Sequence, residues 1–346
     1  MSAKTCKVAQ WATGNIGTRS LRAVIEHPRL QLVGLWVHSK DKAGRDAGEL
    51  CGLPPVGVKA TNSIDDIIAS GPDCVLYMQQ GANVDDLCKL LAAGINVVTT
   101  RVEFHEPGLL DPAVRARIED ACRRGNASLH STGSSPGFST EALPIVLLSL
   151  QRRLDRLTID EFADVSSRNS PEMIFHIMGF GKPPAAFNEH MLAHIKEGFA
   201  KSFAALANAI GLPLEETTVQ GEVGCVLKRT QIAAGILEAG TVGAQRITIS
   251  GLRGGQPLLQ MRLNWYVSRD VDQPSWKLRE SGWRVLVEGD VPLDVSITYP
   301  VAPEDYAAMT PGLTAHRAVN AVHVVCEAPA GIRTTAELPQ VITQLG

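Results

Sequence analysis

The chain has 346 residues, which is more than one compact core usually holds, so two domains are expected. Its composition of 45% hydrophobic and 20% charged residues is typical of globular proteins and excludes a disordered or coiled-coil chain. The formal net charge of -3 comes with no basic tract, so the electrostatic surface that binds nucleic acid is missing and no nucleic-acid partner is expected.

The cysteines and the apolar segments indicate a cellular compartment. The seven cysteines are scattered and lack CxxC spacing, which is typical of reduced thiols and does not predict a metal site. The start of the chain has no apolar run of the signal-peptide kind, and no stretch approaches the roughly 18 consecutive apolar residues that span a membrane. The sequence therefore predicts a cytoplasmic protein with no membrane partner.

Short apolar runs alternate with amphipathic segments through the first part of the chain. This alternation predicts an α/β fold, with a Rossmann-type, doubly wound parallel sheet in a dinucleotide-binding domain over residues 1–138. The expected strands are 7–11, 30–38, 74–78, 96–99 and 127–131, and the expected helices are 18–26, 84–93 and 112–123.

A different pattern begins near Glu141 and predicts a second domain over residues 139–309. An apolar helix starts there, and Gly254 with Gly255 and Gly289 with Asp290 give hairpin signals further on. A long helical region is expected at 185–210, and strands are expected at 246–250, 258–267, 283–288 and 293–299. These elements predict an α+β domain for substrate binding and oligomerisation, built on an open, largely antiparallel sheet.

Two expectations concern packing and assembly. The last helix, at 314–326, ends before Pro329 and Gly331, and the segment 310–346 is expected to pack back on the first domain. The strands of the second domain are expected to form an apolar sheet that one layer of helices cannot fully cover, so a homodimer is predicted.

A glycine-rich turn directly follows the first predicted strand. Gly14 would let the backbone approach a pyrophosphate, Gly17 would let helix and strand pack closely, and the amides at the helix start would face the negative charge. The turn has GxGxxG spacing with alanine at the first position, in Ala12, Thr13, Gly14, Asn15, Ile16 and Gly17. Such turns also occur without a ligand, but the strand before and the amphipathic helix after favour a dinucleotide.

The end of the second strand indicates which dinucleotide is preferred. An acid there would bond the ribose 2'-hydroxyl of NAD, but the chain has His38, Ser39 and Lys40, with Arg45 close behind. These hydroxyl and cationic groups favour a 2'-phosphate, so NADP is the expected cofactor and NAD the alternative. A solvated loop, or a ribose bound by Asp41, would fit the same residues.

Several strings of the sequence resemble a known family. In the first half they are VHSK at 37–40, MQQG at 78–81, TTRVEF at 99–104 and TGSSPGF at 132–138, and in the second half DVSS at 164–167, SPEM at 170–173, MGFG at 178–181, RAVNA at 317–321 and AGIRT at 330–334. The chain resembles the dihydrodipicolinate-reductase-like family, and more specifically its branch of 2,4-diaminopentanoate dehydrogenases and native amine dehydrogenases. It lacks the paired histidines and lysine with which true dihydrodipicolinate reductases hold a dicarboxylate.

The resemblance implies further cofactor contacts at the ends of the later strands, with the segment 134–138 beneath the nicotinamide. The implied contacts are Gln79, Gln80, Gly81, Thr99, Thr100, Ser135 and Pro136. The resemblance also implies four candidates for the wall of the substrate pocket, for which core packing is the alternative. These are Phe138, Phe175, His176 and Met178.

The resemblance implies chemistry at a carbon that alternates between amine and imine. A small ketone or aldehyde would condense with ammonia and receive a hydride from the nicotinamide, or an amine would be oxidised in the reverse direction. A carboxylate must then carry protons on nitrogen and stabilise the iminium, and Glu103 falls on the loop where related enzymes have this glutamate. Glu106 is an alternative, as is a solvated surface role for both residues. A carbonyl or alcohol oxidoreductase and a dinucleotide-binding protein without turnover are the other functions considered.

Overall fold

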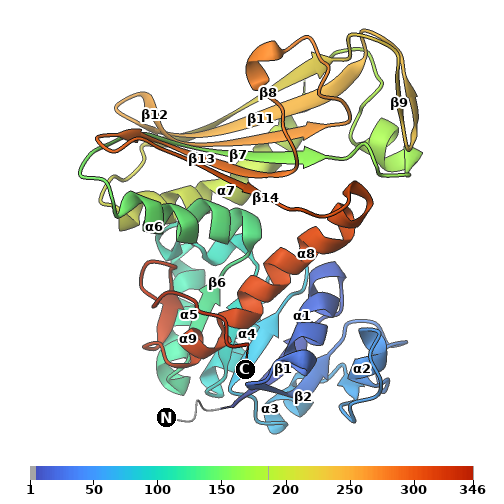
Figure 1. Ribbon diagram of the computed structural model, residues 1–346. Coiled ribbons are helices and arrows are strands. Elements are labelled where there is room, and N and C mark those ends of the chain that lie inside the picture. The colour runs from blue at the N-terminus through green and yellow to red at the C-terminus, as the bar shows by residue number, and fades with distance from the viewer. Residues whose placement is uncertain (1–4, 186, 346) are drawn as a thin grey trace. The chain divides into compact units, whose positions relative to one another are not determined.

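The computed structural model describes residues 5–185 and 187–345, and the chain divides into two compact units (Figure 1). Unit 1 comprises residues 1–142 and 310–346, and unit 2 comprises residues 143–309. The boundary falls after Ala142 rather than after Phe138. Residues 1–4, 186 and 346, which fall in the predicted domains and in the helical region predicted at 185–210, lie outside the described residues.

A seven-stranded sheet forms the centre of unit 1, and all its neighbouring strands pair in parallel. Its order is β15-β6-β5-β4-β1-β2-β3. The strands are β1 (Cys6–Trp11), β2 (Leu30–Trp36), β3 (Ala60–Thr61), β4 (Cys74–Tyr77), β5 (Asn96–Thr99), β6 (Ser128–Ser131) and β15 (Gly331–Arg333). The strand order reverses between β1 and β4, which is the switch point at which doubly wound sheets bind ligands. The predicted Rossmann-type fold is confirmed.

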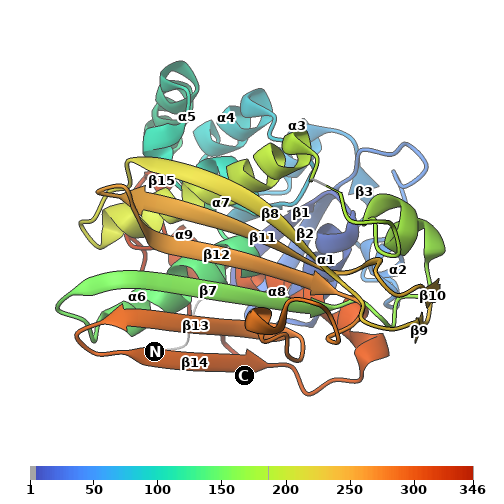
Figure 2. The same ribbon diagram turned by 90° about the horizontal axis from the view of Figure 1, so that it is seen from above.

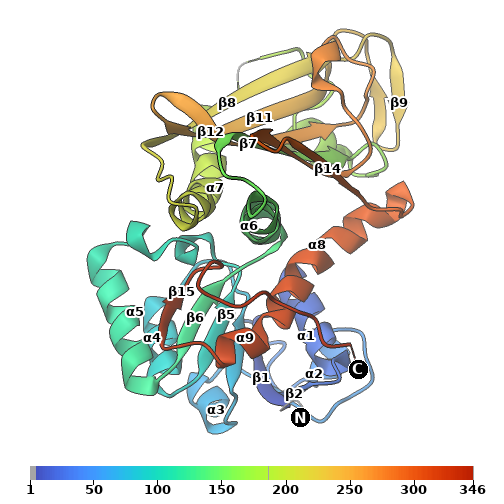
Figure 3. The same cartoon turned by 60° about the vertical axis from the view of Figure 1, so that its left-hand side comes forward.

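Helices cover both faces of this sheet (Figure 3). On one face α4 (Val84–Ala92) and α5 (Pro112–Gly125) pack against Ala9 and Trp11 of β1, and on the other α1 (Asn15–Glu26) and α9 (Val322–Cys326) pack against Val8. Successive residues of a strand point to opposite faces, so a strand covered on both sides is apolar throughout. This double burial explains why the strands of unit 1 read as continuous apolar runs.

Several shorter elements of unit 1 escaped prediction because they hold too few residues to show a period. They are α2 (Ala47–Leu50), α3 (Ile64–Ala69), β3, β15, and the helical turns η1 (Val102–Phe104), η2 (Pro107–Leu109) and η3 (Ser134–Ala142). The helix predicted at 314–326 is two helices, because α8 (Pro303–Asn320) ends before α9 begins.

Unit 2 is built on a six-stranded sheet of order β14-β13-β7-β12-β11-β8 (Figure 2). β7 and β12 pair in parallel, and the other neighbouring strands pair antiparallel. The strands are β7 (Leu154–Asp164), β8 (Glu216–Cys225), β11 (Val242–Arg253), β12 (Gln256–Tyr266), β13 (Gly282–Gly289) and β14 (Leu293–Thr298), while β9 (Thr230–Ile232) and β10 (Gly235–Leu237) form a separate pair. The predicted open, largely antiparallel sheet is confirmed.

One face of this sheet is covered by α6 (Leu143–Leu148) and α7 (Glu189–Ala209). Phe203 and Leu206 of α7 are fully buried in one cluster with Ile159 of β7 and Met261 of β12. The side chain of Asn188 caps α7, because its oxygen accepts the amide of Met191 at 3.1 Å. Two turns, η4 (Glu172–Ile177) and η5 (Pro274–Trp276), complete the unit.

The opposite face of the central strands is mixed, with polar residues beside Phe162 and Tyr266, which are buried in an apolar cluster, so the prediction of an apolar sheet does not hold for the polar part of this face. Asp160 and Arg262 follow Ile159 and Met261 in their strands and therefore point away from α7. Arg262 Nε and Nη2 each donate to a carboxylate oxygen of Asp160 at 2.6 Å. The homodimer stays a prediction, without support from an uncovered apolar face.

The cysteines are all free thiols. In residues 5–185 and 187–345, no helix combines the length and hydropathy needed to cross a bilayer. Nor do three His, Cys, Asp or Glu side chains in this part of the chain converge as metal ligands would.

Candidate functional site

The glycine-rich turn connects β1 to α1 and leaves the start of the helix open. Ala12 has φ +71, a left-handed conformation that favours glycine, and it occupies the position where the fingerprint has its first glycine. A Cβ on Gly17 would lie 2.3 Å from the carbonyl oxygen of Ala12, so only glycine fits there. By contrast, a Cβ on Gly14 would meet nothing within 4 Å, and φ is -74. The packing of the protein therefore requires glycine at position 17 but leaves open space at position 14.

Gly14 is also the N-cap of α1, where no side chain caps the helix. The first amides of a helix have no partners within the helix and attract anions. Asn15 instead uses its side-chain oxygen to bind Arg19 of the next turn. The start of α1 therefore combines open space at Gly14 with amides that no side chain caps.

Gln10 and Ser20, both fully buried, hold the turn in place. Gln10 Nε2 donates to the carbonyl oxygen of Ala12 at 3.0 Å, and Ser20 Oγ donates to Gln10 Oε1 at 2.7 Å. Neither residue was predicted, although a glutamine inside an apolar strand is a signal that could have identified it, because buried amides need partners.

The loop after β2 brings one lysine to the turn. Lys42 Nζ lies 3.0 Å from Thr13 Oγ1 and 3.3 Å from the carbonyl oxygen of Thr13. The predicted residues Lys40 and Arg45 are exposed, as are His38 and the alternative ribose ligand Asp41, while Ser39 is half-buried. Lys42 was outside the predicted set, since nothing in the sequence distinguishes it from its cationic neighbours.

The predicted residues after β4 and β5 take part in internal hydrogen bonds. Gln79 Oε1 accepts the indole N–H of Trp11 at 2.9 Å, and Gln79 Nε2 donates to the carbonyl oxygen of Gly81 at 3.2 Å. Thr99 Oγ1 donates to the carbonyl oxygen of Tyr77 at 2.8 Å. These side chains tie the strand ends together. Gln80 is exposed and Thr100 half-buried at the same edge of the sheet.

Glu103 lies in η1, the turn that follows β5. Arg101 Nη2 donates to Glu103 Oε1 at 2.8 Å, and the side chains of the two residues are 25% and 31% exposed. The other carboxylate oxygen, Oε2, is buried and has no hydrogen-bond partner among the described residues. The backbone of Arg101 is fixed as well, because its carbonyl oxygen accepts the hydroxyl of Ser131 at 2.7 Å. Arg101 was not predicted, since the sequence does not reveal which way a loop arginine turns.

Glu106 has a different environment from Glu103. Its Oε1 accepts the amide of Gly108 at 3.0 Å, so the side chain caps η2. A capping carboxylate contributes to the local structure of the loop. The two glutamates that the sequence offers as candidate proton carriers therefore differ in their hydrogen bonds: Glu106 caps a turn, and Glu103 does not.

Further buried polar atoms of unit 1 lack hydrogen-bond partners. In the described part of the chain they include Arg101 Nε, Thr132 Oγ1, Ser135 Oγ, Ser139 Oγ and Arg317 Nε. Ser135 and Pro136, joined by a cis peptide bond, lie in η3 directly after β6. The carboxyl ends of parallel strands meet at one edge of a sheet, so Arg101, Thr132 and Ser135 follow strands at the edge of unit 1 at which the glycine-rich turn lies, while Ser139 lies further along η3 and Arg317 lies in α8. We call this set, together with Glu103 Oε2, the unsatisfied edge.

The candidates for the substrate pocket divide between the two units. Phe138 lies in unit 1, where the guanidinium of Arg317 stands 5.9 Å from its ring centroid. In unit 2, Phe175 and Met178 pack against the core cluster that includes Ile174, which is the core role considered above. His176 is exposed, and its carbonyl oxygen accepts Lys182 Nζ at 3.3 Å.

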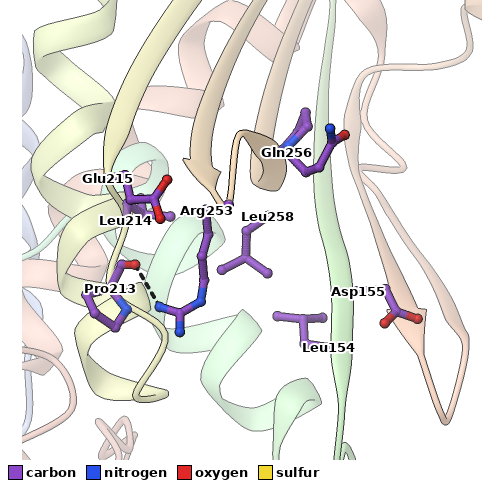
Figure 4. Close-up of a pocket in the computed structure, with 10 residues that line it drawn as sticks. Leu154, Asp155, Pro213, Leu214, Glu215, Arg253, Gln256 and Leu258 are labelled. Carbon is purple, nitrogen blue, oxygen red and sulfur yellow. Dashed lines mark hydrogen bonds between the residues drawn. The ribbon is translucent and has the colours of Figure 1, made fainter.

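Unit 2 also has a pocket of about 750 Å³ near the β11–β12 turn, lined by Leu154, Leu258 and Arg253 among others (Figure 4). Arg253 Nη1 donates to the carbonyl oxygen of Pro213 at 3.0 Å across it. None of the predicted site residues lines this pocket.

Comparison with known proteins agrees with the resemblance stated above. An amine dehydrogenase of Streptomyces virginiae is 28% identical over 344 residues, which cover 95% of each chain. Among solved structures, the chain is similar to an amine dehydrogenase from Mycobacterium smegmatis, with a TM-score of 0.70, 19% identity and coverage of 98% of this chain and 97% of that one. It is also similar to a probable dehydrogenase from Thermotoga maritima, with a TM-score of 0.54, 12% identity and coverage of 95% and 91%.

Two family models match the chain. Residues 11–106 match the model described as dihydrodipicolinate reductase, N-terminus, and residues 139–346 match the 2,4-diaminopentanoate dehydrogenase C-terminal domain. The structural similarities, all at low identity, show the fold. Because the second model matches more than half of the sequence, the chain belongs to the 2,4-diaminopentanoate dehydrogenase C-terminal domain family.

Proposed function

We propose that this protein is an NAD(P)H-dependent oxidoreductase that interconverts a small carbonyl compound and ammonia with an amine. The observation that carries the proposal is the carboxylate of Glu103. One of its oxygens is held by Arg101 at 2.8 Å and the other is buried without a partner, at the edge of a Rossmann sheet. A fixed carboxylate with one free oxygen is suited to carry protons for a nitrogen that becomes cationic.

The residues of unit 1 fit a nicotinamide dinucleotide. The open space at Gly14 and the uncapped amides of α1 suit a pyrophosphate, which needs close approach and several N–H donors. The unsatisfied hydroxyls of Thr132, Ser135 and Ser139 suit the carboxamide end of such a cofactor. Buried polar atoms without partners are rare in folded proteins, so a bound polar group accounts for several of them at once.

NADP is the proposed preference, with NAD as the alternative. The loop after β2 has no acid at the strand tip and offers Ser39, Lys40 and Arg45 to a 2'-phosphate. Lys42 adds a fourth donor, since its ammonium already lies against Thr13 of the glycine-rich turn.

Glu103 would act on the substrate nitrogen. Its free oxygen accepts a proton as ammonia adds to the carbonyl carbon, and returns a proton to the oxygen that leaves as water. The resulting iminium cation is stabilised by the same carboxylate, while Arg101 keeps the other oxygen in place. When bound, the reduced nicotinamide would supply hydride to the iminium carbon. The sum is one carbonyl compound, one ammonium ion and one reduced cofactor giving one amine, one water and one oxidised cofactor.

The test is cofactor absorbance at 340 nm with a panel of small ketones and aldehydes, with and without ammonium. We expect NADPH consumption that requires ammonium. Consumption without ammonium would replace the proposal by a carbonyl or alcohol oxidoreductase. If no compound of the panel causes NADPH consumption, with or without ammonium, while the cofactor still binds, the protein would be a dinucleotide-binding protein without turnover.

A further inference from the structure

A buried polar cluster includes one residue of the loop that carries Glu103, His105. His105 Nδ1 lies 2.6 Å from Glu141 Oε1, and the two side chains are each 1% exposed. The contact is close but not aligned as a hydrogen bond, so it is a short polar contact between two buried side chains. Glu141 Oε2 in turn accepts the hydroxyl of Thr335 from the C-terminal segment.

The cluster joins three segments of unit 1 that are distant in sequence. His105 belongs to the loop after β5, Glu141 to η3 after β6, and Arg317 and Thr335 to the C-terminal segment. Arg317 also feels the charge of Glu141, because burial lowers the pKa of its guanidinium and the carboxylate of Glu141 opposes that shift. Glu141 is therefore the negative centre to which the other segments are tied.

A second imidazole in the region, that of His130, does not form an ion pair with Glu141. Burial lowers the pKa of His130 to about 4, so its ring is neutral at neutral pH. Its Nδ1 is occupied by the carbonyl oxygen of Arg333 at 2.8 Å. The carboxylate of Glu141 opposes this lowering of the pKa of His130, but burial outweighs it.

Buried ion pairs are weak contributors to stability, since desolvation offsets much of their attraction, but they fix geometry. Only one residue separates His105 from Glu103, and between them Phe104 is buried in the core. Among the described residues, the side chain of Glu103 has one hydrogen-bond partner, Arg101, so the position of its carboxylate also depends on the loop backbone that it shares with His105.

We infer that Glu141 is a positioning residue for Glu103: by holding His105 it fixes the loop 101–106, and with it the direction of the free oxygen of Glu103. The inference rests on the proposed function, because it assigns Glu141 a task only if Glu103 carries protons. The same cluster attaches this loop to η3. The unsatisfied atoms of the loop, in Arg101 and Glu103, therefore keep a fixed position relative to those of η3, in Ser135 and Ser139.

The test is a double-mutant cycle between Glu141→Gln and Glu103→Gln in the ammonium-dependent assay, with NADPH affinity measured by fluorescence titration. In the wild-type background Glu141→Gln should lower kcat by about 10-fold while the Kd for NADPH changes by less than about 2-fold. In the Glu103→Gln background it should lower kcat by less than about 2-fold, because the position of a side chain that carries no protons no longer matters.

Two further variants complete the design. His105→Gln breaks the same pairing from the other side and should repeat the pattern, which keeps the test valid if Glu141→Gln fails to fold. Asp160→Asn in unit 2 removes a buried carboxylate from a pair with the partly exposed Arg262 and serves as the control, with kcat unchanged well below its melting temperature.

An equal loss of kcat from Glu141→Gln in both backgrounds would overturn the inference, as would full activity of Glu141→Gln and His105→Gln. Full activity of Glu103→Gln would instead overturn the proposed function itself, so the two failures are distinguishable.

Discussion

The polar side chains on the sheet of unit 2 and those at the strand ends of unit 1 differ in how completely they are hydrogen-bonded. On the sheet of unit 2, Asp160 receives two bonds from Arg262 at 2.6 Å, and Asn264 Oδ1 accepts Arg246 Nε at 2.7 Å. At the unsatisfied edge of unit 1, the free oxygen of Glu103 and several hydroxyls have no partner among the described residues.

Under the proposed function, this difference distinguishes structural polar groups from groups that would contact a ligand. A buried polar atom without a partner costs free energy, so several of them in one region favour a bound polar group. The network of Asp160 completes itself within unit 2 and predicts no ligand. The unsatisfied edge does not complete itself, and the ends of β5 and β6 that it follows lie at the carboxyl edge of the Rossmann sheet, where such sheets bind ligands.

The largest expected effect comes from removing the charge of Glu103. Glu103→Gln should lower turnover in the ammonium-dependent assay by about 100-fold or more, the scale of a lost general acid or base, with NADPH affinity and melting temperature nearly unchanged. Glu106→Gln is the matched control and should be mild, because Glu106 caps η2. Loss of turnover in Glu106→Gln with full activity in Glu103→Gln would exchange the two roles.

The next effect distinguishes a ligand-facing glycine from a structural one. Gly14→Ala should raise the Kd for NADPH by about 10-fold while the apo protein keeps its melting temperature to within a few degrees, because a Cβ there meets no protein atom. Gly17→Ala should instead destabilise the apo protein, since its Cβ would meet the carbonyl oxygen of Ala12 at 2.3 Å. Fluorescence titration and thermal unfolding measure the two effects, and unchanged NADPH binding in Gly14→Ala would remove the pyrophosphate from this turn.

A somewhat smaller effect is expected at Lys42. Lys42→Ala should raise the Kd for NADPH by about 5-fold and that for NADH by less than about 2-fold, if its ammonium contacts the 2'-phosphate. Lys40→Ala, from the same loop, shows whether the half-buried or the exposed lysine matters more. An equal loss for both dinucleotides would assign Lys42 to the pyrophosphate and leave the NADP preference unsupported.

The smallest effect concerns the backbone of the turn. Ala12→Gly should stabilise the protein by about 0.5 kcal/mol, because relief of the left-handed conformation at φ +71 slightly exceeds the extra chain entropy that glycine loses on folding. Chemical denaturation of the two proteins without cofactor measures this difference. A less stable Ala12→Gly variant would show that the methyl group of Ala12 contributes more packing than the backbone costs.

Much of unit 1 could be predicted because its signals are local and periodic. The strand at 96–99 and the start of α4 at Val84 match the prediction, since buried parallel strands are apolar throughout and Asn83 is a strong helix cap. In unit 2, β7 was missed, because Asp160 and the other polar residues of its second face interrupt the apolar pattern. The same polar residues invalidated the expected apolar sheet.

The glycine-rich turn and the candidate glutamate could be predicted from the sequence, but the residues that contact them could not. The spacing of Gly14 and Gly17 reveals the turn, and the place of Glu103 after a strand makes it a candidate. Lys42, Arg101 and Glu141 were missed, because their roles depend on where loops fold in three dimensions and no sequence period encodes that. A carboxylate such as Glu141 within an otherwise apolar helical stretch is nevertheless a signal worth following.

The claim that the unsatisfied edge awaits a cofactor is tested most directly by hydrogen–deuterium exchange with and without NADPH. We predict increased protection of the amides in segments 12–18 and 132–140, and no change in segments 158–162 and 246–250, where the polar side chains are already satisfied. Protection confined to the sheet of unit 2, or none in either region at a saturating NADPH concentration, would contradict the account.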